Sequence, residues 1–174
     1  MNITYDFNDD NGPVPAHQHP NGGGWVADTA TVDEKAFVGP DAIVSGKAIV
    51  SDYAKVSEYA KVSGNARVSG NAQVYGNVIV SGKAIVSEYA KVSGNARVSE
   101  YAKVSGNVSV CGNAEVSGNA RVYGNTEVYG NALVYGNAQV FDNARVSGSA
   151  IVHGNAKVSK TPVRISGSDG YDFI

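Results

Sequence analysis

The chain has 174 residues and a formal net charge of −2, and 43% of its residues are hydrophobic whereas only 9% are aromatic. Because it contains one Met, one Trp and four Phe, most of its apolar residues are Val and Ala, which cannot fill the space between packed layers of helices and sheets. The single Cys111 excludes an internal disulfide framework and a cysteine-rich metal site, and the near-neutral charge argues against a nucleic-acid-binding protein.

Residues 1–23 form an acidic segment without a repeat. Its ITYDF stretch, residues 3–7, has the alternation of a strand, whereas PVPAHQHPNGGG, residues 13–24, predicts a loop. We expect the segment to cap the region that follows, whose first strands would otherwise expose unpaired backbone. The N-terminus lacks the basic and apolar parts of a signal peptide, and no run of about 18 apolar residues occurs. We therefore expect a soluble protein that is neither secreted through a signal peptide nor embedded in a membrane.

Residues 24–160 are governed by a period of six. Every sixth residue from Val26 to Val158 is Val, and the residue two positions before each Val is Gly24 at the start and then Ala. The exceptions to Ala are Val78, Val108 and Thr126. The unit is A-x-V-S-G-N, with S-E-Y replacing S-G-N in places. A six-residue step advances about 600° around an α-helix, so the valines would not share one face, and a helix is excluded.

The A-x-V triplet predicts a very short strand, with Ala and Val pointing inward and the residue between them pointing outward. The three residues that follow predict a sharp turn, because Gly and Asn tolerate positive φ better than other residues. Strands this short are not stable singly, so successive windings must stack and pair in parallel. The sequence therefore predicts a solenoid.

Residues 161–174 fall outside the repeat, since the valine register ends at Val158. Their RISGSDGYDFI stretch alternates again and ends on Phe-Ile, which is unusual for a soluble tail. Two interpretations stay open. The segment caps the last coil, or it begins a further module of a longer protein.

The repeat resembles that of the hexapeptide-repeat family, whose units place a small residue four positions after an aliphatic one, as Val62 and Ala66 do in VSGNAR. The resemblance covers residues 24–160. It implies an all-β fold, a left-handed parallel β-helix of triangular section with three hexads in each coil, and hence about 7–8 coils. The units are most similar to extended repeat proteins of bacteria and phages that are called acetyltransferase-like on their fold alone.

With three hexads in each coil, residues 18 apart lie above one another, and the outward positions form three columns. The first column is the most apolar, and we predict that its large side chains form a contact surface. These residues are Trp25, Ile43, Ile79, Leu133 and Ile151. The alternative is that they only serve the β-propensity of the strands. The resemblance implies a homotrimer as the assembly that such a surface would form.

The turns form columns as well. Asn77, Asn95, Asn113 and Asn131 fall in one column, where their amides are predicted to form a ladder from coil to coil. Aromatic residues also lie at turns, and two interpretations are open for them. They stiffen the solenoid by stacking on one another, or they bind a glycan.

The family includes acyltransferases that use a catalytic His beside a loop interrupting the coils, but here the register is unbroken from Val26 to Val158. His153, at a regular turn position, is therefore a weak candidate for a catalytic base. The family also includes enzymes that hold zinc through three His, and His17 and His19 are weak candidates for metal ligands. We expect no cofactor, and acetyl-CoA only if the chain is an acyltransferase.

Two functions follow. The first is a non-enzymatic rigid structural or interaction rod, self-assembled as a trimer, cytoplasmic or virion-associated, and binding a host or virion component through protein or glycan contacts. The alternative is an acyltransferase subunit that lacks an evident catalytic loop.

Overall fold

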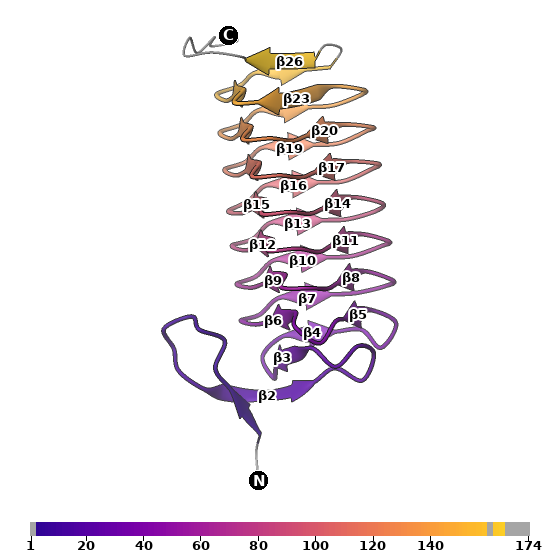
Figure 1. The fold of residues 1–174 in the computed structure, drawn as a ribbon, viewed down its shortest axis with the longest axis vertical. Helices are drawn as coiled ribbons and strands as arrows, with labels where there is room; N and C mark the ends of the chain where they lie inside the picture. The colour runs from indigo at the N-terminus through magenta and orange to yellow at the C-terminus, as the bar shows by residue number, and fades with distance from the viewer. Residues whose placement is uncertain (1–2, 160–161, 166–174) are drawn as a thin grey trace.

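The computed structural model describes residues 3–159 and 162–165. These residues form a rod of stacked coils (Figure 1), and among them there are strands and turns but no helix. Each coil contributes one short strand to each of three sheets, which we call the first, second and third faces.

The first face is a ten-stranded sheet, and the other two have eight strands each. The first face consists, in spatial order, of β1 (Thr4–Tyr5), β2 (Val14–Gln18), β3 (Trp25–Ala27), β6 (Ile43–Val44), β9 (Lys61–Val62), β12 (Ile79–Val80), β15 (Arg97–Val98), β18 (Glu115–Val116), β21 (Leu133–Val134) and β24 (Ile151–Val152). The second face consists of β4 (Thr31–Val32), β7 (Ile49–Val50), β10 (Arg67–Val68), β13 (Ile85–Val86), β16 (Lys103–Val104), β19 (Arg121–Val122), β22 (Gln139–Val140) and β25 (Lys157–Val158). The third face consists of β5 (Phe37–Val38), β8 (Lys55–Val56), β11 (Gln73–Val74), β14 (Lys91–Val92), β17 (Ser109–Val110), β20 (Glu127–Val128), β23 (Arg145–Gly148) and β26 (Pro162–Ile165).

The strands pair in parallel with a register of 18 residues along most of the rod. Val68, for example, pairs with Val50 below it and Val86 above it. The last pair differs, because β23 pairs with β26 with Arg145 opposite Pro162. The structure confirms the all-β solenoid that the repeat predicts, and the left-handed parallel β-helix of about 7–8 coils that the hexapeptide-repeat resemblance implies.

The core is a column of Val and Ala one side chain deep. Nearly all the valines of the repeat and the alanines two positions before them are buried completely, and they form one continuous cluster. Val32 and Ala30, in the first coil, are only partly buried. The small aliphatic composition that excludes a layered core is therefore the composition that fills this narrow one.

The turns use positive φ at their middle residue, which is usually Gly. The Asn that follows this Gly does not have positive φ in the described turns, so the expectation that Gly and Asn share this role is wrong for Asn. In the S-E-Y turns the middle residue is Glu, and Glu58, Glu88 and Glu100 adopt φ of 56°, 63° and 59°. These values lie in the left-handed region that non-glycine residues enter at a cost.

The N-terminal segment covers one end of the rod with a hairpin. β1 pairs antiparallel with β2, and β2 pairs antiparallel with β3, so the first face continues into the hairpin (Figure 1). Residues 13–24 are thus not all loop, as the sequence suggests, because β2 occupies 14–18. The Pro15 carbonyl accepts a hydrogen bond from the Asp28 N–H, 2.9 Å away, just beyond the end of β3. A proline is tolerated there because the partner strand stops beside it.

Candidate interaction surfaces

The predicted contact residues of the first face lie in one column, but they differ in what covers them. Trp25 and Ile43 pack against the small apolar cluster of the N-terminal hairpin, which contains Phe7, Ala16 and Ala27. The Tyr5 ring stacks on the Trp25 ring with centroids 4.6 Å apart. The chain itself therefore covers the first two residues of the predicted strip.

The rest of the strip consists of Ile79, Leu133 and Ile151, which are half-buried. Leu133 and Ile151 are direct neighbours across the β21–β24 pair. Arg97 and Glu115 separate Ile79 from Leu133 along the column. That these side chains form an interface stays a prediction.

The asparagine column forms a chain of side-chain hydrogen bonds. The Asn77 amide donates to the Asn95 carbonyl oxygen at 3.3 Å, Asn95 to Asn113 at 3.1 Å, and Asn113 to Asn131 at 2.9 Å. Two further ladders, at the other two corners, were not singled out from the sequence. They join Asn107, Asn125 and Asn143, and Asn119, Asn137 and Asn155. The 18-residue spacing of these asparagines is the signal that could have identified them.

The turn aromatics fall into two groups. Two of those at the first position of a turn stack on the ring one coil away, Tyr123 on Phe141 at 5.4 Å and Tyr135 on His153 at 5.3 Å between centroids. Tyr75 and Tyr129 also occupy first positions, but the residues one coil away from them are not aromatic. Those at the third position, after Glu or Asp, are exposed: Tyr53, Tyr59, Tyr89 and Tyr101. The stacking interpretation therefore fits Tyr123 and Tyr135. In the second group, the Lys35 ammonium lies over the Tyr53 ring, 5.6 Å from its centroid, and the Lys83 ammonium over the Tyr101 ring, 5.0 Å from its centroid. Tyr59 and Tyr89 have neither kind of ring contact among the described residues.

Each of the three histidines has different contact partners. The exposed His17 bonds the Asp28 carboxylate through Nδ1 at 2.8 Å. His19 is only 3% exposed, and its Nε2 lies 3.1 Å from the Ala36 carbonyl oxygen, which the Asn21 amide also bonds. No group of three His, Cys, Asp or Glu able to hold a metal occurs in residues 3–159. His153, the weak catalytic candidate, is placed by its stacking on Tyr135.

Cys111 occupies the first position of a turn on the third face. Burial, and after it the negative charge of Glu127, raise the pKa of the Cys111 thiol above its usual value. The thiolate is the nucleophilic form, so this thiol is held in its less reactive state.

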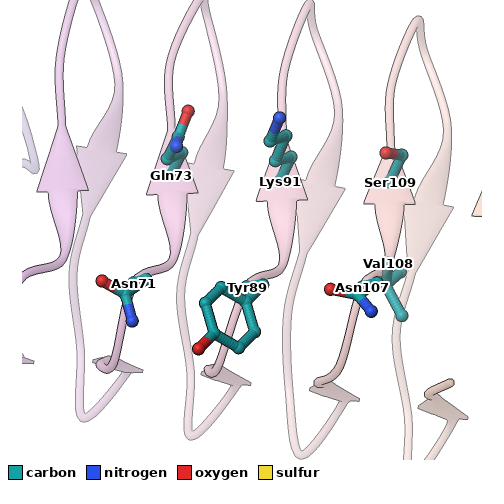
Figure 2. A pocket seen from close by; sticks show the side chains of 7 residues that line it. All are labelled: Asn71, Gln73, Tyr89, Lys91, Asn107, Val108 and Ser109. Atoms are coloured by element: carbon teal, nitrogen blue, oxygen red, sulfur yellow. The ribbon is translucent and has the colours of Figure 1, made fainter. Parts of the chain in front are cut away.

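The described part of the rod has hollows on its surface, two of which lie beside exposed or stacked tyrosines. The larger, of about 510 Å³, lies at the corner between the second and third faces and is lined by Asn71, Gln73, Tyr89, Lys91, Asn107, Val108 and Ser109 (Figure 2). The smaller, of about 310 Å³, is lined by Lys103, Ser105, Arg121, Val122, Tyr123 and Gln139. Both are open to solvent, and the sequence predicts neither.

The structure as described defines a β-solenoid whose distinctive features are surfaces, ladders and turns. Its described part contains no helix long and apolar enough to cross a membrane.

A comparison with protein families identifies the family of the chain. The model of the bactofilin family, described as polymer-forming cytoskeletal, matches residues 48–151. Because the match spans more than half of the chain, this protein belongs to the bactofilin family. The hexapeptide-repeat resemblance and this match have the β-solenoid in common. No curated protein matches the chain.

Proposed function

We propose that this protein is a non-enzymatic structural rod whose copies assemble with one another. The observation that carries the proposal is the match of residues 48–151 to a polymer-forming family, over coils that continue without interruption. A rod with a solid core of Val and Ala has the rigidity that a structural element needs.

The part of the first face formed by Ile79, Leu133 and Ile151 is the contact surface that we propose for lateral assembly. The second face also has two outward-pointing isoleucines, Ile49 and Ile85, but these alternate along the column with Arg67 and Lys103. Two second faces brought together would set like charges against each other, which disfavours association. Three rods joined through their first faces would form a closed trimer, which is the assembly that the hexapeptide-repeat resemblance implies.

The double variant Ile79→Lys/Leu133→Lys tests the proposal, with Ile49→Lys/Ile85→Lys as the matched control. We expect the first-face variant to lower the mass in analytical ultracentrifugation and to abolish assemblies seen by electron microscopy, while the second-face variant behaves as the parent. Melting curves check that both variants fold. A first-face variant that assembles normally refutes the lateral contact, and a parent protein that is monomeric at high concentration refutes self-assembly itself.

The proposed role is cytoplasmic and requires no cofactor. If the chain is instead an acyltransferase subunit, acetyl-CoA should bind it and raise its melting temperature in a saturable way. We expect no such shift. A host or virion component is a further proposed partner of the rod, supported only by the likeness to phage-encoded repeat proteins.

A further inference from the structure

Tyr89 lies on the larger hollow, and its surroundings differ from those of the stacked aromatics. Its side chain is 61% exposed, and the residues one coil below and one coil above it are Asn71 and Asn107. No aromatic ring is stacked on it among the described residues. Stiffening of the solenoid through ring stacking therefore does not account for Tyr89.

The hollow lies beside a turn that differs from the usual turn of the repeat. Val108 stands where the repeat usually has Ala, and it is buried. The Gly106 φ two residues earlier is 90°, compared with 72° at Gly94, which precedes an Ala. The bulkier inward side chain thus accompanies a more open turn, next to the place where the Tyr89 ring lies.

Figure 2 shows how the lining side chains are arranged. Gln73, Lys91 and Ser109 stand side by side on neighbouring strands of the third face, and Tyr89 lies beside them between Asn71 and Asn107, with its ring seen nearly face-on. An open aromatic face is therefore bordered by amides, a hydroxyl and an ammonium group. These groups offer both donors and acceptors, which is what a ligand rich in hydroxyl groups requires.

This combination suits a sugar ring better than the other ligand classes. The apolar C–H face of a pyranose packs on an aromatic ring, and its equatorial hydroxyl groups bond planar amides and ammonium groups at the ring's edge. The hollow is too open to enclose a small apolar ligand, which needs most of its surface buried. Its single cation, Lys91, gives no cluster for a phosphate group.

The pair of Tyr and Lys recurs along the same corner, although there the Lys35 ammonium lies over the Tyr53 ring, 5.6 Å from its centroid. Tyr53 and Lys55 stand two coils below Tyr89 and Lys91 in the same columns, within the hexads SDYAKV and SEYAKV. At a strand spacing of ~4.8 Å, two coils separate the tyrosines by ~9.6 Å along the rod. Each coil rise is thus close to the length of one residue in an extended, β-linked sugar chain, so such a chain could lie along the corner and contact both tyrosines.

We propose that the corner of the rod centred on Tyr89 and Lys91 is a binding site for an extended polysaccharide. Tyr89 stacks on one sugar ring, Lys91 and Gln73 bond its hydroxyl groups, and Asn71 and Asn107 bond the flanking residues. The site binds its ligand non-covalently and catalyses no reaction. The proposal does not depend on self-assembly.

The test uses the full chain with ¹³C-labelled tyrosine and oligosaccharides of cellulose, of chitin and of polygalacturonate as probes. The key variant is Tyr89→Asn, which restores the Asn found one coil above and below and so should fold. Tyr59→Asn is the matched control, because Tyr59 occupies an identical SEYAKV hexad and is 63% exposed. Titrations followed by NMR give the dissociation constants, and melting curves confirm folding.

We expect at least one of the oligosaccharides to bind saturably, to shift the ring signals of Tyr89 and to lose affinity by about tenfold in Tyr89→Asn but not in Tyr59→Asn. Three results overturn the proposal. They are the absence of saturable binding by all three probes, an equal loss in both variants, and binding of polygalacturonate alone that Tyr89→Asn leaves unchanged, which would be charge attraction only.

Discussion

The middle residue of each turn shows how one dihedral angle constrains the sequence. Where it is Glu, φ lies between 56° and 63°, close to the left-handed minimum that an L-residue can enter. Before Val78, Val108 and Thr126 it is Gly, with φ of 89°, 90° and 84°. A bulky inward residue therefore goes with a turn angle that only Gly adopts without strain.

A pair of glycine variants tests this relation. A Cβ added to Gly76 would lie 2.6 Å from the Gly94 carbonyl oxygen of the next coil, whereas a Cβ at Gly23, where φ is 80°, would have nothing described within 4 Å. We expect Gly76→Ala to destabilise the protein by about 3 kcal/mol, from both strain and clash, and Gly23→Ala by about 1 kcal/mol, from strain. Urea unfolding measures both values. Equal losses would show that stacking of the coils plays no part.

The reactivity of Cys111 follows from its raised pKa. Burial is the larger cause of the raised pKa and the Glu127 carboxylate the second, so Glu127→Gln should lower the pKa of the thiol in part and increase the thiolate fraction at a given pH. We expect iodoacetamide to modify Cys111 faster in Glu127→Gln than in the parent at pH 8, and the difference to vanish well above the pKa of both. Mass spectrometry of quenched samples measures the rates. A slower reaction in Glu127→Gln would contradict this sign.

At the scale of elements, the N-terminal hairpin is a unit with its own small core. Tyr5 contacts both Phe7, edge to face at 5.0 Å, and Trp25, stacked at 4.6 Å. These contacts lie outside the Val and Ala core of the rod. The hairpin can therefore open without unwinding the coils.

Truncation of Tyr5 tests this independence. Tyr5→Ala removes both ring contacts and should destabilise the hairpin by about 3 kcal/mol. We expect faster hydrogen exchange at Ala16 and His19, whose backbone N–H groups bond Ile3 and Gly24. The Ile85 N–H, bonded to Ala102 in the middle of the rod, serves as the control and should not change. Faster exchange at Ile85 as well would mean that the hairpin and the rod unfold together.

At the scale of the whole molecule, the coil is the unit of stability, because each coil contacts only its neighbours. Deletion of residues 81–98, one coil, joins Val80 to Ser99 in the same phase of the repeat. We expect the shortened protein to fold and to unfold with a smaller dependence on denaturant. Deletion of 81–89 instead breaks the phase of the repeat and should prevent cooperative folding. Circular dichroism and urea titration compare the two, and cooperative unfolding of the second would refute the register argument.

The repeat by itself determined the fold. Val at every sixth position leaves a short strand and a turn as the only local structure, and a narrow aliphatic core as the only packing. The 18-residue columns that follow from this period also placed Asn77 directly below Asn95. The structure shows a hydrogen bond of 3.3 Å between their side-chain amides. These features depend only on period, which can be read from the letters.

Tertiary structure decided what the period does not carry. The sequence could not show that Tyr5 covers Trp25, because the hairpin lies outside the repeat and its position depends on packing across the end of the rod. Nor could the sequence show that Tyr89 borders a hollow, because Tyr59 occupies an identical hexad elsewhere in the chain. A hollow depends on the neighbouring coils, and beside Tyr89 these include the turn before Val108, where the Gly106 φ is 90°. The period specifies which residues share a column, and only the packed coils specify which of those columns leave room for a ligand.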